Sequence, residues 1–189
     1  MHLLTFENWE MKVSPELLLI KSFRDLYRSD KTRNKEFFLK ELSYIYFMID
    51  PRSTYMYITD EKKRSETIIQ QEDLKNTHGD FQINDTLKEC MKWYKKHTTT
   101  TSTLMLEDTL IAADKIREFL RNIDFSKVDA NGKPVYNVQQ VTSAMKNIMD
   151  IIPQLKELEK KVTRDVEDKT RTGVMDKNMF EDESPVYKE

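Results

Sequence analysis

The side chains that could do chemistry are few in this sequence, and their spacing does not match a known type of reactive site. His2, His78 and His97 are isolated and lack the paired spacing of a zinc-binding helix. Cys90 is the only cysteine, which excludes a disulfide within the chain and a zinc site built from several thiolates. No glycine-rich phosphate loop or GxSxG sequence occurs. We therefore expect no catalytic residue, no cofactor and no metal site.

The segment that starts at Asp129 resembles the beginning of a calcium-binding loop but lacks two of its required residues. An EF-hand loop needs glycine at its sixth position and glutamate at its twelfth. Here Gly132 is the fourth residue and Gln140 the twelfth. The Asn131-Gly132 pair is instead a strong turn signal. We expect a short β-hairpin around it, shortened by Pro134, which cannot donate a ladder hydrogen bond.

The best polar group of side chains consists of Asp50, Arg52 and Asp60, which flank a pair of spaced tyrosines. One interpretation is structural, with turn capping and a local ion pair. The other is a partner-binding site in which Arg52, Tyr55 and Tyr57 anchor another protein, because Arg and Tyr are favoured at interfaces. A catalytic role for Asp50, Arg52 and Tyr55 is the least favoured interpretation.

A lysine cluster lies beside two aromatic residues, and it has two possible explanations. Lys92, Lys95 and Lys96 surround Trp93 and Tyr94, a combination that can contact a nucleic-acid backbone. The formal net charge of the whole chain is -2, however, and no wider basic region surrounds the cluster. A solvated helix face, with the aromatic residues in the core, is the favoured interpretation.

The composition predicts a mainly α-helical protein. The chain has 189 residues with only 3 glycines and 5 prolines, fewer than turn-rich β proteins usually need. Charged residues make up 34% of it, with nearly equal numbers of each sign, as on solvated helix faces. The first residues lack the basic and apolar regions of a signal peptide, and no apolar run approaches the length of a membrane span. We expect a protein made in the cytosol.

Apolar residues at helical spacing predict a bundle of helices with extended ends. We expect an extended N-terminal arm at 1–13, a helical domain at 14–168 with the hairpin inserted at about 124–136, and an acidic C-terminal tail at 169–189. Asp50 precedes a proline and should end a helix. The threonine-rich run after His97 favours a break, with a continuous helix as the alternative. Pro153 should kink or break the last helix.

The N-terminal arm is rich in apolar residues at irregular spacing. Leu3, Leu4, Phe6, Trp9 and Met11 give it too much apolar surface to stay solvated. The arm should therefore pack either on its own domain or on a neighbouring subunit. Trp9 is accordingly a further candidate for partner binding.

Three segments, taken in order, resemble a known group of virion proteins. They are FFLKELSYIYFMIDPRSTYMYITDEKKR, DANGKPVY followed by NVQQVTSAMKNI, and LKELEKKVTRDVED followed by an acidic tail. Their order is similar to that in the head-to-tail connector, or neck ring, proteins of crAss-like tailed bacteriophages. Each segment alone is common, and the order is the more specific signal.

This resemblance implies a structural role without catalysis. It implies a homo-oligomer, a dodecameric ring, that joins the portal vertex to the tail and extends the DNA channel. Partners would be the portal protein, adjacent ring or tail proteins and passing DNA that is not read by sequence, with no membrane involved. The location would be the virion neck, after assembly in the host cytoplasm. The alternative function is a cytosolic helical adaptor that binds one protein partner through residues 41–70.

Overall fold

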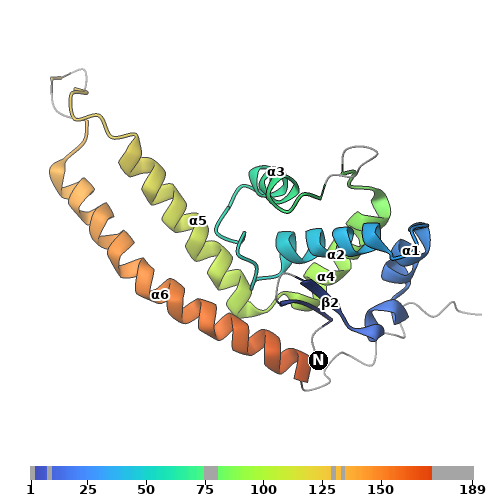
Figure 1. Ribbon diagram of the computed structural model, residues 1–189. Helices are drawn as coiled ribbons and strands as arrows, with labels where there is room; N and C mark the ends of the chain where they lie inside the picture. Colours follow the sequence, from blue (N-terminus) through green and yellow to red (C-terminus); the bar gives the residue numbers. More distant parts are fainter. Residues whose placement is uncertain (1–2, 8–9, 75–80, 129–130, 133–134, 172–189) are drawn as a thin grey trace, which may run out of the picture. The chain divides into compact units, whose positions relative to one another are not determined.

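The computed structural model describes residues 3–7, 10–74, 81–128, 131–132 and 135–171, and it divides the chain into two units. Unit 1 comprises residues 1–100 and 163–189, and unit 2 comprises residues 101–162. The described part is mainly helical, which confirms the predicted class. Figure 1 shows the elements in chain order. The residues expected to form the tail beyond Arg171 lie outside the described part.

Unit 1 begins with a β-hairpin that the sequence analysis expected to be an extended arm. Strands β1 (Leu4–Glu7) and β2 (Glu10–Val13) pair antiparallel, with Leu4 opposite Val13. Alternating apolar residues in both segments fit this pairing, because one face of the ribbon then packs on the core. The hairpin is followed by five helical elements: η1 (Pro15–Leu19), α1 (Lys21–Ser29), α2 (Glu36–Ile49), α3 (Glu61–Gln71) and α4 (Asp85–Thr98).

The helix starts and stops follow the local sequence signals. Asp60 caps α3 by accepting hydrogen bonds from the Lys62 and Lys63 backbone amides, and Asn84 caps α4 by accepting one from the amide of Leu87. Helix α2 ends before Asp50, as the following proline predicted. The break expected in the threonine run is also confirmed, because α4 ends at Thr98 and α5 begins at Thr101.

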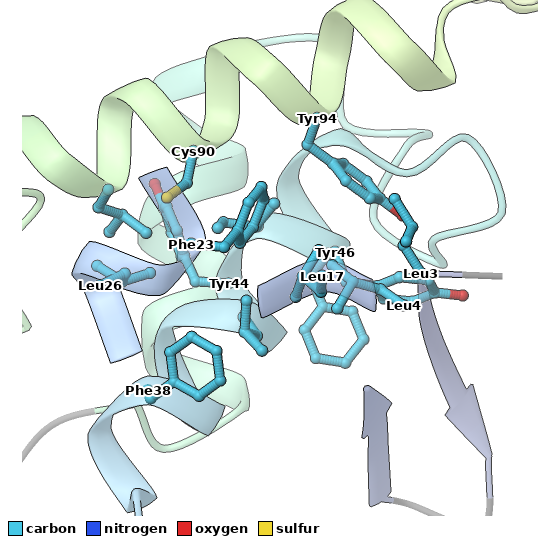
Figure 2. Close-up of a cluster of buried hydrophobic side chains, with 14 of the residues drawn as sticks. Leu3, Leu4, Leu17, Phe23, Leu26, Phe38, Tyr44, Tyr46, Cys90 and Tyr94 are labelled. Carbon is cyan, nitrogen blue, oxygen red and sulfur yellow. The ribbon is translucent and has the colours of Figure 1, made fainter. Parts of the chain in front are cut away.

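The core of unit 1 is built around α2, which contacts α3, α4 and both strands of the hairpin. Figure 2 shows the buried side chains of α2 and α4 meeting those of the N-terminal segment. The ring of Phe6 lies 4.9 Å from that of Phe47, and Phe23 lies 5.6 Å from Trp93, both edge to face. The N-terminal segment therefore packs on its own unit. Trp9 lies outside the described residues.

Unit 2 consists of α5 (Thr101–Arg121), a loop, and the first part of α6 (Val138–Arg171), which continues into unit 1. The two helices run antiparallel (Figure 1). Pro153 lies inside α6, so the break considered there is absent. The apolar spacing of α6 continues on both sides of the proline.

The β-hairpin predicted at about 124–136 falls partly on residues outside the described part, namely 129–130 and 133–134. Gly132 has a left-handed φ of +73°, as an Asn-Gly turn requires, and the Val135 amide donates to the Lys127 carbonyl at 2.9 Å. The described residues of the loop between α5 and α6 contain an isolated bridge at Val128 but no paired strands.

Candidate functional site

The polar group singled out in the sequence forms a buried cluster around the carboxylate of Asp50. Oδ1 accepts hydrogen bonds from the backbone amide and Nε of Arg52 at 2.9 and 2.8 Å. Oδ2 accepts from Nη2 of Arg52 at 2.7 Å and from the hydroxyl of Tyr94 at 2.6 Å. Arg52 Nη2 also donates to the carbonyl of Leu4 at 3.3 Å. The cluster therefore joins the end of α2 to α4 and to strand β1.

Burial and charge set the protonation states in this cluster. Asp50 is 0% exposed and the side chain of Arg52 is 18% exposed. Burial acts to lower the pKa of Arg52, but the hydrogen bonds and the negative charge of Asp50 raise it overall. Burial and the charge of Asp50 raise the pKa of Tyr94 well above its usual value. A charged Arg52 and a neutral Tyr94 thus donate hydrogen bonds to the carboxylate of Asp50. This arrangement is that of a structural ion pair.

The other residues proposed for partner binding are not gathered at this cluster. Tyr55 is buried, and its hydroxyl donates to the carboxylate of Glu72, while burial and this carboxylate raise the pKa of Tyr55. Tyr57 is 67% exposed and is available to a partner. Asp60 is used as the cap of α3. Local spacing could not show this separation, because a turn can send neighbouring side chains in different directions.

Cys90 and His97 both lie among other side chains of unit 1. Cys90 is buried, and burial raises the pKa of its thiol to about 12, which disfavours the nucleophilic thiolate. His97 stacks on Trp93 at 3.9 Å, and its Nδ1 lies 2.8 Å from the Trp93 carbonyl oxygen. In the described ranges, no three His, Cys, Asp or Glu side chains are placed to hold a metal ion. None of the helices described is long and apolar enough to cross a membrane.

The lysine cluster of α4 lies on the exposed side of that helix. Lys92, Lys95 and Lys96 are exposed, whereas Tyr94 is buried and Trp93 is half-buried. The aromatic rings therefore face the unit 1 core and are not presented to bases together with the lysines. This arrangement fits the solvated-face interpretation.

Unit 2 presents a very different surface, which the sequence analysis missed. None of the described residues between Glu107 and Lys161 is buried. Its exposed large apolar side chains come from both helices and the loop: Leu104, Met105, Ile111, Phe119, Phe125, Val128, Val135, Val138, Met145, Met149 and Ile152. Helical spacing predicted that these helices are amphipathic, but it could not predict which of their apolar side chains stay exposed. Because contiguous exposed apolar patches are often sites of protein contact, this surface is a candidate site.

Comparison with known proteins gives no relative that could assign this surface. The chain matches no family model, no curated protein and no solved structure.

We expect Asp50→Asn to lower the free energy of unfolding by about 3–5 kcal/mol, because it leaves the half-buried guanidinium of Arg52 without a counter-charge. Tyr94→Phe should cost less, about 1–2 kcal/mol, since Arg52 still pairs with the carboxylate. Urea unfolding measures both values. Glu66→Gln, on the exposed face of α3, is the control and should change little. Equal stability of Asp50→Asn and the parent chain would contradict a structural role.

A second prediction concerns Glu41 on α2, whose Oε1 lies 3.5 Å from the Asn84 side-chain nitrogen. Burial raises the pKa of Glu41 to about 7 from its usual 4.5. The folded state therefore binds this proton more tightly, and the resulting stability is present below pH 4.5 and is lost as the pH rises towards 7.

Glu41→Gln should remove this loss. Its unfolding free energy should match that of the parent chain near pH 4 and exceed it by about 1–2 kcal/mol at pH 8, allowing for partial solvent exposure. Denaturant titrations across this pH range measure the difference. A difference that shrinks with rising pH would contradict the assignment, and the exposed Glu66→Gln serves again as control.

Proposed function

We propose that this chain is a structural subunit of a phage neck, a connector ring that joins the portal vertex to the tail. The proposal combines the resemblance of three ordered segments to neck ring proteins of crAss-like phages with the surface of unit 2. In this role the chain forms a homo-oligomer, a dodecameric ring. It contacts the portal protein on one side and a ring or tail protein on the other. It is assembled in the host cytoplasm and resides in the virion neck.

The observation that carries the proposal is the lack of buried residues between Glu107 and Lys161 in the described part of unit 2. Two antiparallel helices cannot enclose a core, and helical bundles bury their apolar stripes with at least one further layer. Each side chain such as Met149, which is 72% exposed, would contribute about 1–2 kcal/mol on burial. Contact with other chains is a direct way to gain that stabilisation.

The charge of the chain suits a channel through which DNA passes. Nearly balanced charges and a net charge of -2 give no general attraction for phosphates. A conduit should release DNA, and strong basic patches would retard it. The lysines of α4 are interspersed with acidic residues such as Glu89 and do not form a broad basic surface.

The alternative, a cytosolic adaptor that binds one partner through residues 41–70, has less support. Arg52 and Tyr55 make their contacts inside unit 1, and Tyr57 alone of the proposed anchors described here is strongly exposed. One exposed tyrosine is a small basis for an interface, which usually has a central cluster of buried anchors.

Purified phage particles provide the test of this function. The protein should be detected in them by mass spectrometry, and genes for a portal and a major capsid protein should neighbour its own. In a phage that carries Met149→Glu, incorporation should fall by roughly thirtyfold or more, because a charge would be buried in an apolar contact.

Asn147→Glu is the matched control, since it adds the same charge to an exposed position on the opposite side of α6. It should be incorporated normally, and both variants should unfold at the same denaturant concentration. Absence of the parent protein from particles would refute the proposed location. Normal incorporation of Met149→Glu would refute the role of the unit 2 surface.

A further inference from the structure

Unit 2 carries two narrow rows of exposed apolar side chains, one on each helix. The α5 strip is Met105, Ala112 and Phe119, and the α6 strip is Val138, Met145 and Ile152. Within each strip the residues are seven apart, so they lie along one line of the helix. Met105 and Phe119 are 51% and 38% exposed, and Met149 lies beside the α6 strip.

Helical rotation predicts that the two strips lie on opposite faces of the helical pair. Each helix also has a more buried stripe, formed by Leu106, Ala113 and Leu120 on α5 and by Ala144, Ile151 and Leu158 on α6. On α5, each residue of the strip comes one position before a residue of the more buried stripe. On α6, Met145 and Ile152 come one position after a residue of the more buried stripe. One residue is a rotation of about 100°. Because the helices run antiparallel (Figure 1), opposite rotations place the strips on opposite faces.

The strips are complementary in size and register. An antiparallel pairing that places Met145 opposite Ala112 also places Val138 opposite Phe119 and Ile152 opposite Met105. All three pairs form in a single register, and a large side chain meets the smallest one at the centre. Such alternation of large and small residues is what allows helix surfaces to interdigitate.

Charge is depleted on the α6 side of this pairing, whereas residues 105–119 of α5 include six charged side chains. The segment 138–152 contains two charged residues, Lys146 and Asp150, in a chain that is 34% charged. Loss of charge at the centre and enrichment in methionine, here Met145 and Met149, distinguish the cores of protein interfaces from other surfaces. An uncharged strip also allows two copies of one chain to approach without like-charge repulsion.

We infer that the α6 strip of one copy packs against the α5 strip of the next copy. This inference deepens the proposed ring function and rests on its self-association. A contact between two different surfaces is heterologous, and repetition of it produces a ring when the rotation closes. Copies whose helical pairs point the same way bring α6 and the next α5 together antiparallel, as the register requires. One such contact is smaller than a standard interface of about 800 Å² per partner, so closure supplies much of the stability.

Disulfide cross-linking between two variants, each with one added cysteine, tests this contact. Ala112→Cys and Met145→Cys are each prepared in the full chain, where Cys90 is buried and the parent chain reports its background. Under mild oxidation, a cross-linked dimer should form when the two variants are mixed. It should not form above background when either variant is oxidised alone. Ala112→Cys mixed with Asn147→Cys is the matched control and should remain at background.

A dimer from Met145→Cys alone would overturn the inference, because it indicates a two-fold contact between like strips. Absence of a dimer from the mixture at protein concentrations up to about 1 mM would also overturn it. These results are separate from the test of function. If the protein is present in particles but the cross-link does not form, only the proposed contact is contradicted. If the cross-link forms but the protein is absent from particles, only the proposed neck location is contradicted.

Discussion

The Asp50 carboxylate has no exposed surface and accepts hydrogen bonds from Arg52 and Tyr94, which lie on separate segments of unit 1. Through Arg52 the same cluster reaches the carbonyl of Leu4 and so fixes the N-terminal hairpin. A buried carboxylate is tolerated only where its oxygens are all engaged. This requirement fixes the end of α2, the following turn, α4 and β1 in one arrangement, around which the aromatic core packs.

Most of the described part of unit 2 differs from unit 1 in burial. Its helices have apolar faces but, in the described residues between Glu107 and Lys161, no buried side chain. In the proposed function, the chain combines a unit that has its own core with a second unit whose apolar surface would contact other chains. A subunit of a larger assembly needs both properties, because a folded unit can be made and stored while the contact surface waits for its neighbours.

The sequence predicted what depends on local chemistry. The helix end at Asp50 and the break after Thr98 follow from proline and threonine preferences. The link between Asp50 and Tyr94 spans 44 residues and could not be read from spacing. The N-terminal strands were also missed, because tertiary packing outweighs weak local preferences there. At Pro153 a kink or a break was predicted, and the break is absent because α6 continues through the proline. Exposure of the unit 2 strips depends on which other elements pack on α5 and α6. The helical spacing of apolar residues does not show which elements these are.

Hydrogen–deuterium exchange on the isolated full-length chain and on its assembled form tests the central claim most directly. The claim is that unit 2 is completed by other chains while unit 1 is complete alone. Amides of α2 should be protected in both forms, whereas amides of α5 and of α6 up to Val162 should exchange quickly in the isolated chain and become protected on assembly. Equal and strong protection of both units in the isolated chain, unchanged by assembly, would contradict this account.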